Sequence, residues 1–274
     1  MGTWLTKFCI LVLVFLYQIS AYAQYSILNQ SGDIRANALS QTGVVTLNPT
    51  SAINNPAHAA LTDFHQVGLI SHPYIRTSEL SFVSLHSSFK LSPKQGIGII
   101  LQREGSTHLN EILAGINFGQ KLGEHSSLGI GLSMISKQFP ESKNALGLIP
   151  EIGIQTQLFP QLTMAVLVRN PIPIEIQKGT RFQSDYRLGL CYQPSKGLQL
   201  YFGGQKSGTL DPDAHLGVEY QIVKRLQIRF GAKTSGSFSF GTGILFRKNL
   251  IFDLLADIHM RLGPRLGIGL NWLF

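Results

Sequence analysis

The residues with the clearest catalytic potential lie at alternate positions near the end of the sequence. Asp257 and His259 are two residues apart, and Asp253 precedes them on the same alternation. A carboxylate beside a histidine can make a general base for hydrolysis. However, the sequence has no G-x-S-x-G elbow and no H-E-x-x-H pair, and its eight histidines are scattered. We therefore expect no enzyme, no metal site and no cofactor.

A wider set of charged side chains follows the same alternation through the second half of the chain. Two interpretations stay open. Opposite charges on neighbouring strands can pair and fill an interior, or they can form a selectivity ring that acts on a polar solute. The predicted set is Glu151, Arg187, Glu219, Arg229, Lys233, Asp253, Asp257, His259 and Arg261.

The elements that must position these residues have a period of two. Between residues 216 and 222, Leu, Val, Tyr and Ile alternate with Gly217, Glu219 and Gln221. Residues 186–192, 226–232 and 250–260 repeat the pattern. Such strands have one apolar and one polar face. They fit either a soluble β-sandwich or a membrane barrel whose apolar face meets lipid.

Three features favour the barrel. The polar face of the strands is rich in glycine and also holds Glu, Asp, Arg and Lys. Most segments reach the length of about 9–11 residues that a tilted strand needs to cross a bilayer. The chain also ends inside an alternating segment, 266–274, which resembles the C-terminal strand that the outer-membrane barrel assembly machinery recognises. Trp272 and Phe274 would carry that assembly signal.

The strand count defines the predicted fold, which is an all-β, antiparallel transmembrane barrel of about fourteen strands. An even number is expected for a bacterial barrel, with short turns on the periplasmic side. The strands are predicted to begin near Gln66, Glu79, Gln95, Asn110, Ser126, Ala145, Gln161, Ser184, Gly197, Ala214, Arg225, Ser237, Leu250 and Arg265.

The N-terminus predicts export. Lys7 precedes an apolar stretch over residues 8–19, and Ala21-Tyr22-Ala23 forms a cleavage site. We expect residues 1–23 to be a cleaved signal peptide, which leaves Cys191 as the one cysteine and so excludes an intrachain disulfide. An exported membrane barrel is expected in the outer membrane of a Gram-negative cell. Residues 66–274 would form this barrel, and outer-membrane lipid would surround it.

The segment between the signal and the barrel, residues 24–65, is too polar for another membrane hairpin. A segment that precedes the first strand can fold into a barrel and plug it. Asn54, Asn55 and Pro56 allow two interpretations, which are compatible. Asn-Pro is a common turn signal, and the asparagine amides could anchor the plug to the barrel wall.

This segment resembles the N-terminal hatch of the long-chain fatty acid transporter (FadL) superfamily, and it is closest to the PorV/PorQ-like branch of Bacteroidota. The similar residues are 35–40 (RANALS), 51–57 (SAINNPA) and Ala60-Leu61, although Ser40-Gln41 stands where the family usually has Gly-Gly. The resemblance implies a plugged fourteen-stranded barrel. It also adds Arg35 to the plug anchor.

The resemblance implies one of two roles. PorV/PorQ-like members serve the type IX secretion system in protein secretion or surface attachment, and we expect this role first. FadL-like members admit small hydrophobic compounds, which is the alternative. The sequence does not name the ligand, the secretion partner or the oligomeric state, nor does it say whether the plug moves.

The net charge of +8 does not predict nucleic-acid binding, because the compartment excludes it. Several of the basic residues fall in predicted periplasmic turns, namely Lys94, Lys196, Lys224, Arg225, Arg247 and Lys248. They are either solvated turn residues or contacts for anionic lipid headgroups or an acidic periplasmic partner.

Overall fold

The computed structural model describes residues 32–46, 52–73, 81–106, 110–138, 144–177, 180–260 and 263–274, without the side chains of 174–181. The predicted signal peptide and Arg261 lie outside the described residues. No helix in these ranges is long and apolar enough to cross a membrane.

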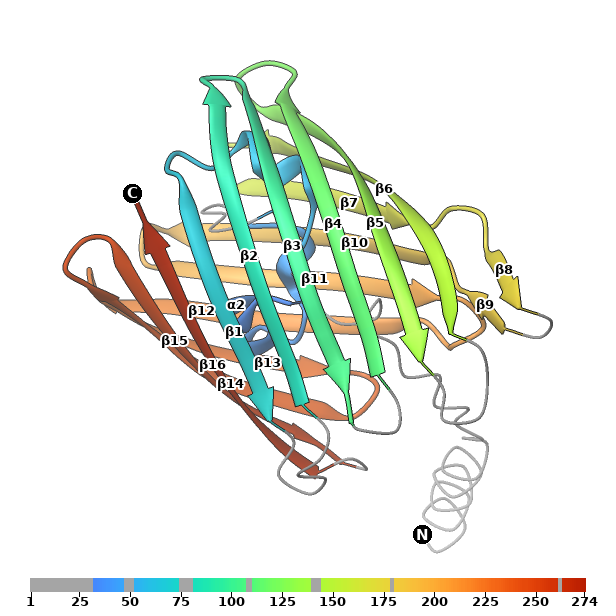
Figure 1. The fold of residues 1–274 in the computed structure, drawn as a ribbon. Coiled ribbons are helices and arrows are strands. Elements are labelled where there is room, and N and C mark those ends of the chain that lie inside the picture. Colours follow the sequence, from blue (N-terminus) through green and yellow to red (C-terminus); the bar gives the residue numbers. More distant parts are fainter. Residues whose placement is uncertain are drawn as a thin grey trace, which may run out of the picture.

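Fourteen antiparallel strands close into a barrel, in which β1 pairs with both β2 and β16 (Figure 1). Two further strands, β8 and β9, form a separate hairpin between β7 and β10. The predicted fold class is therefore confirmed. The strands are β1 Gln66–Pro73, β2 Ser81–Ser92, β3 Gln95–Gly105, β4 Asn110–Lys121, β5 Ser126–Gln138, β6 Ala145–Phe159, β7 Leu162–Arg169, β8 Ile174–Gln177, β9 Thr180–Phe182, β10 Asp185–Ser195, β11 Leu198–Ser207, β12 Asp213–Val223, β13 Leu226–Lys233, β14 Ser237–Phe246, β15 Leu250–His259 and β16 Gly263–Leu273.

The predicted starts of the barrel strands agree with the structure to within two residues. The largest differences are at β2, which begins at Ser81 where Glu79 was expected, and at β16, which begins at Gly263 where Arg265 was expected. The sequence analysis predicts no strand between those that begin near Gln161 and Ser184, so it missed the β8–β9 hairpin. The two strands of this hairpin have only four and three residues, which is too short for a clear alternation.

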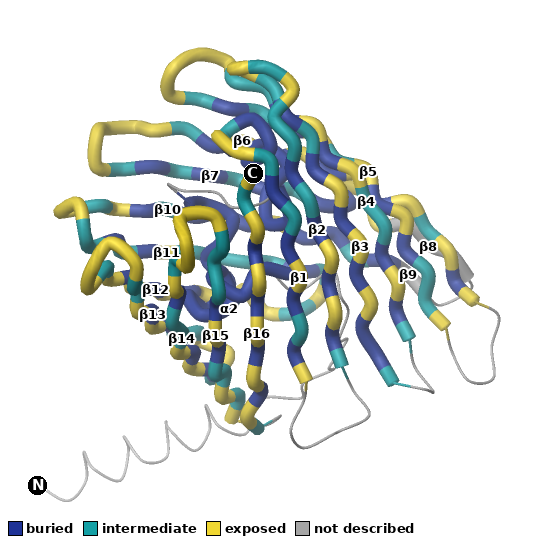
Figure 2. Tube along the Cα trace, turned by 60° about the vertical axis from the view of Figure 1, so that its left-hand side comes forward, coloured by how far each residue is buried: buried dark blue, intermediate teal, exposed yellow. Residues whose placement is uncertain are grey.

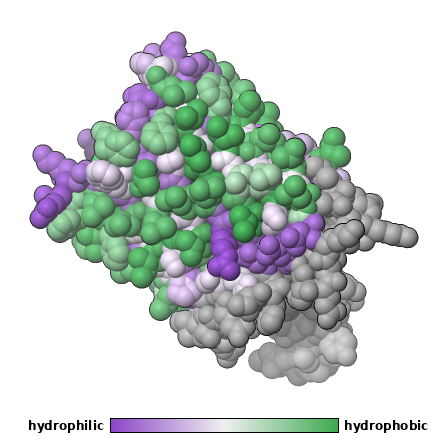
Figure 3. All heavy atoms as spheres, in the orientation of Figure 1, coloured by the Kyte–Doolittle hydropathy of each residue, from purple (hydrophilic) through white to green (hydrophobic). Residues whose placement is uncertain are grey.

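Alternation sorts the side chains into an outer and an inner face. On β12, Leu216 and Tyr220 are 53% and 48% exposed, whereas Glu219 between them is 2% exposed. Apolar side chains gather in a belt on the outer face, with hydrophilic residues toward the barrel ends (Figure 3). An apolar band of this kind suits lipid, because charged groups there are costly.

The two ends of the barrel differ. The turn end carries Phe274 and the connections that follow β2, β4, β6, β10, β12 and β14, whereas the loop end carries the remaining connections, including the β8–β9 hairpin (Figure 1). The turns predicted as periplasmic, at 92–94, 159–161, 194–196, 223–225 and 247–249, all lie at the turn end. That this end faces the periplasm stays a prediction.

The residues before β1 lie inside the barrel. We call the described residues 32–46 and 52–62 the lumen segment; it contains α2 (Ile34–Ala38), η2 (Thr42–Val44) and η3 (Pro56–Ala60). Helix α2 contacts β13 to β16, η2 contacts β7 and β10 to β12, and η3 contacts β2 to β6. Nearly all of this segment is buried (Figure 2). It therefore touches the wall on every side.

A sharp turn separates α2 from η2. Ser40 and Gln41 have φ angles of 53° and 66°, in the left-handed region that favours glycine. These are the two positions at which the resembled family usually has Gly-Gly. Ser40 and Gln41 thus adopt a left-handed backbone conformation that glycine adopts more easily.

Candidate functional site: the barrel lumen

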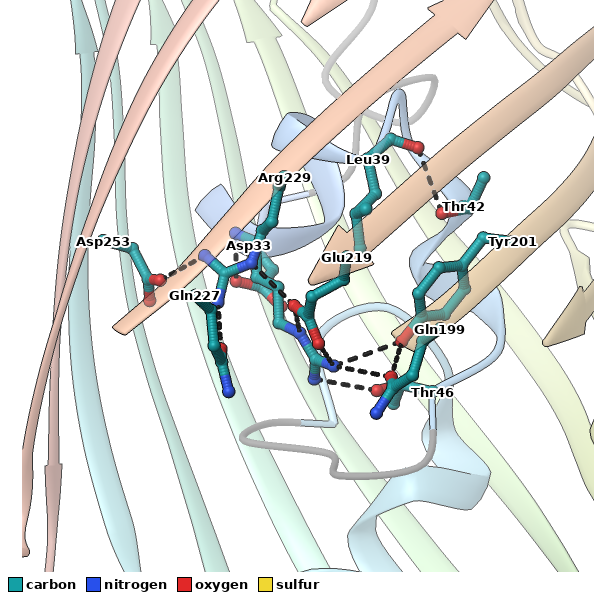
Figure 4. A network of polar contacts seen from close by, with 11 residues as sticks. Asp33, Leu39, Thr42, Thr46, Gln199, Tyr201, Glu219, Gln227, Arg229 and Asp253 are labelled. Atoms are coloured by element: carbon teal, nitrogen blue, oxygen red, sulfur yellow. Dashed lines mark hydrogen bonds and ion pairs between the residues drawn. The ribbon is translucent and has the colours of Figure 1, made fainter. Parts of the chain in front are cut away.

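Arg35 of α2 is the centre of a buried polar cluster in the lumen. Figure 4 labels its partners Thr46, Tyr201 and Glu219. The Arg35 Nε and Nη2 atoms donate to the two carboxylate oxygens of Glu219 at 2.8 and 2.7 Å. Nη1 donates to Thr46 Oγ1 at 2.9 Å, and Nη2 also lies 3.2 Å from the Tyr201 hydroxyl. The guanidinium therefore joins the lumen segment to β11 and β12.

Arg229 of β13 completes this cluster. Its Nε donates to Glu219 at 2.7 Å, and its Nη1 donates to Asp253 of β15 at 2.5 Å. Two guanidinium groups and two carboxylates are thus brought together, all nearly inaccessible to solvent. Buried charges need such pairing, because removing one partner leaves an uncompensated charge.

Asp33 supports the same cluster from the start of α2. Its carboxylate accepts the Arg35 backbone N–H at 3.0 Å and the Asn54 amide at 3.2 Å. Burial raises the pKa of the Asp33 carboxyl above its ordinary value, although Arg35 favours the charged form. Because its side chain accepts the Arg35 backbone N–H, Asp33 is the N-cap of α2.

Three of the other predicted charges, Glu151, Arg187 and Asp257, each have a partner of opposite charge. Glu151 pairs with Arg169 at 3.1 Å, and Arg187 pairs with Asp185 at 2.6 Å. Asp257 accepts from Arg265 at 2.9 Å and from Ser239 at 2.9 Å. The Asp257 carboxylate is thus engaged on β14 and β16. Lys233, Ser237 and His259 follow one another in register across β13, β14 and β15.

Sequence reasoning missed the partners Arg169, Asp185 and Arg265. A signal for one of them was available, because residues in a hairpin without a bulge face each other at equal distances from its turn. Asp257 and Arg265 are directly opposite across β15 and β16 in this way. Glu151 and Arg169, and likewise Glu219 and Arg229, are also directly opposite, but a register shift next to each turn places them at unequal distances from it.

Asn55 and Pro56 start the second half of the lumen segment. The Asn55 side chain accepts from Ala57 N and donates to the Val44 carbonyl, both at 3.0 Å, and it lies 3.4 Å from the Val166 carbonyl of β7. Pro56 occupies the first turn of η3. Asn55 therefore mainly fixes the segment to itself, as the turn interpretation expects.

The main wall contacts of this half come from residues that the sequence did not single out. Gln155 of β6 accepts the Thr46 N–H at 3.1 Å and lies 3.0 Å from His58 Nε2. The Ala52 backbone bonds Ser88 of β2 and Asn117 of β4 at 3.2 and 2.8 Å. These polar groups tie the segment to the wall opposite Glu219.

Glycines allow the close approach of η3 to the wall. A Cβ atom added at Gly129 of β5 would lie 2.1 Å from the Pro56 carbonyl carbon and 2.2 Å from Ala57 N. No side chain can occupy that space. The lumen-facing glycines are thus part of the fit between segment and barrel.

An apolar cluster lies in the other half of the lumen, on a wall that also carries the buried carboxylates Glu104, Glu111 and Glu151. Inward-facing side chains from β1 to β6 in the loop-end half of the barrel meet the lumen segment there, and each is at most 4% exposed. Most of the charged groups lie on the opposite wall. The members of this apolar lumen cluster are Ile34, Ala38, Ile53, Ile70, Phe82, Ile100, Leu113, Ile135, Ile149, Phe182 and Leu255.

Comparisons with known proteins identify this architecture. No family model matches the chain, and no curated protein matches its sequence. Among solved structures, it is similar to the Ralstonia pickettii toluene transporter TbuX, with 10% identity and a TM-score of 0.70 over 90% of this chain and 100% of that chain. The Pseudomonas putida toluene transporter TodX gives 10% identity and a TM-score of 0.69 over 89% of this chain and 97% of that one.

A third similar structure is a Pseudomonas aeruginosa FadL homologue, with 10% identity and a TM-score of 0.68 over 89% of this chain and 98% of that chain. At these identities the likeness establishes the fold. The expected fourteen-stranded barrel is therefore confirmed as a fold that these solved structures share.

Proposed function

We propose that this protein is an outer-membrane channel for small hydrophobic compounds. The observation that carries the proposal is the apolar lumen cluster. The interior of a water-filled porin is polar, whereas here Ile100, Leu113 and Ile149 face inward and are buried against the lumen segment. An apolar solute is stabilised in such surroundings, and a hydrated one is not.

The charged wall supports the same conclusion. The arginines and carboxylates that the structure describes there are paired with each other, so these groups are not available to bind an ionic solute. The solved structures with this fold include two toluene transporters. We therefore choose toluene as the probe compound.

The test is uptake of radiolabelled toluene by a Gram-negative host that expresses the full chain. We expect uptake above that of cells with an empty vector. Replacing Ile100 or Leu113 by Asn should reduce it several-fold, because a buried amide without a partner makes the lumen unfavourable for an apolar solute. Ile100→Leu keeps the volume and polarity and is the matched control.

Heat-dependent mobility in gel electrophoresis shows whether each variant still forms the barrel. Equal toluene uptake in expressing and empty cells would disprove the proposal. Passage of a hydrophilic sugar in place of toluene would also contradict it, since it would identify an ordinary porin.

We retain the type IX secretion role as a second proposal. The β8–β9 hairpin favours it, because this hairpin projects beyond the barrel wall at the loop end, where a protein partner can reach it (Figure 1). Deleting residues 172–181 from a tagged barrel tests this. Secretion-system proteins should co-purify with the intact barrel and be lost with the deletion, and recovery of none from native outer membranes would reject the role.

A further inference from the structure

Three neighbouring turns at the turn end carry a concentration of positive charge. Lys196 lies between β10 and β11, Lys224 and Arg225 lie between β12 and β13, and Arg247 and Lys248 lie between β14 and β15. All five side chains are exposed. Residues 193–198, 221–226 and 244–250 contain no acidic side chain. We call these five residues the basic rim.

Backbone hydrogen bonds hold the three turns side by side. Gln221 N donates to the Gly197 carbonyl at 2.8 Å, and Leu245 N donates to the Arg225 carbonyl at 2.9 Å. The cations of the basic rim therefore form one continuous patch across adjacent strands. A ligand with several negative charges, or a surface with many, can contact them together.

The β14–β15 turn places its cations at positions that usually disfavour them. Arg247 and Lys248 have φ angles of 53° and 68°. They belong to a loop of three residues, 247–249, between the paired residues Phe246 and Leu250. Positive φ angles in hairpin turns favour Gly, Asn and Asp. A cation pair at this position adds strain, and observed strain is a reason to look for a function.

Exposed apolar side chains lie directly beside the cations. Val223 and Phe246 are 57% and 52% exposed, and each precedes a basic residue in its turn. The Arg247 guanidinium lies 5.4 Å from the centre of the Phe246 ring. The basic rim is thus continuous with the apolar belt, so it lies where lipid headgroups begin.

The rest of the turn end lacks this arrangement. On the opposite side, Lys90, Lys94 and Lys121 are accompanied by the acidic residues Asp63 and Glu124, and Lys90 lies 3.8 Å from Asp63. Positive charge without acidic neighbours is therefore confined to β10–β15. An asymmetric patch of this kind distinguishes a binding surface from a uniformly solvated edge.

We propose that the basic rim binds the phosphate headgroups of anionic phospholipids in the surrounding bilayer. Guanidinium and ammonium groups both bind phosphate, and clusters of basic residues next to a membrane-spanning region recruit anionic lipid. The acyl chains of the same lipids lie on the belt formed by Val223, Phe246 and their neighbours. The proposal does not depend on what passes through the lumen.

The test measures lipid selectivity in bilayers. The full chain is reconstituted in phosphatidylcholine that contains spin-labelled phosphatidylglycerol, and the fraction of motionally restricted label is compared with that of spin-labelled phosphatidylcholine. We expect severalfold selectivity for phosphatidylglycerol at low salt, which high salt weakens. The triple variant K224Q/R247Q/K248Q should lose most of it, since each cation near a membrane surface contributes roughly fivefold.

The matched control is K90Q/K94Q/K121Q, which removes the same number of charges from the other side of the turn end. It should retain the selectivity of the unmodified protein. Absence of selectivity in the unmodified protein overturns the proposal, and so does an equal loss in both triple variants. Binding of a soluble acidic peptide in preference to the lipid would assign the basic rim to a protein partner.

Discussion

Arg35 and Glu219 are 184 positions apart in the sequence and meet in the lumen through two charge-assisted hydrogen bonds of 2.8 and 2.7 Å. Arg35 belongs to the lumen segment and Glu219 to the barrel wall. Because Glu219 also accepts from Arg229, one carboxylate holds two guanidinium groups. This carboxylate is therefore a main attachment point of the lumen segment.

The first prediction concerns this carboxylate. Glu219→Gln should lower the free energy of unfolding by about 3–5 kcal/mol, because it leaves two buried arginines short of a negative charge. Asp253→Asn should cost less, since Arg229 keeps Glu219. Denaturant unfolding of the reconstituted barrel measures both. An Asp253→Asn variant as unstable as Glu219→Gln would contradict the central position of Glu219.

The second prediction concerns the fit of η3 against β5. Gly129→Ala should displace the lumen segment, because the new Cβ would overlap the backbone of Pro56 and Ala57. Gly204→Ala is the control, because the nearest atom to its Cβ is 3.9 Å away. Limited proteolysis of the folded barrel should cleave the segment faster in the first variant alone. Equal cleavage of the two variants would show that the lumen segment tolerates the added Cβ atom at position 129.

The third prediction concerns the turn after α2. Gln41 has a φ angle of 66°, a conformation that costs a side-chain-bearing residue about 1–2 kcal/mol. Gln41→Gly should raise the free energy of unfolding by about 1 kcal/mol or less, because the greater freedom of glycine in the unfolded chain offsets part of the gain. Urea midpoints of the two proteins report the difference. A lower midpoint for the glycine variant would show that the Gln41 side chain matters more than its backbone.

The fourth prediction tests the outer belt. Leu132→Arg, in the middle of β5, should destabilise the membrane-inserted barrel by about 2–4 kcal/mol, and Leu122→Arg at the turn end should cost about 1 kcal/mol or less. Both leucines are well exposed, at 49% and 59%. Unfolding from lipid vesicles measures the two costs. Equal costs would mean that the belt does not lie across a bilayer.

Sequence reasoning succeeded where the signal is local. Alternation located the barrel strands because neighbouring side chains on a strand must face opposite sides. It placed Glu219, Arg229 and Asp253 on the inner face correctly, since a single register decides the face of every residue on a strand. A register shift beside the β12–β13 turn hides the pairing of Glu219 with Arg229 from the sequence.

The missed features depend on contacts across the lumen. Nothing near Gln155 indicates that its amide meets Thr46 and His58, because the path of the lumen segment sets that contact. The role of Asn55 was also not decided by its sequence, since a turn and a wall anchor use the same residues. The structure favours the turn, because its closest bonds lie within the segment.

The sequence by itself determined the barrel, its strand number and the side of the wall on which each residue lies, because a period of two is a local property of the chain. Only the tertiary structure decided what fills the barrel. The closing of β1 on β16 encloses the lumen segment between the charged wall and the apolar lumen cluster. Tertiary folding alone brings Arg35 to Glu219 and Ile34 to Gly269, and no local pattern encodes these contacts.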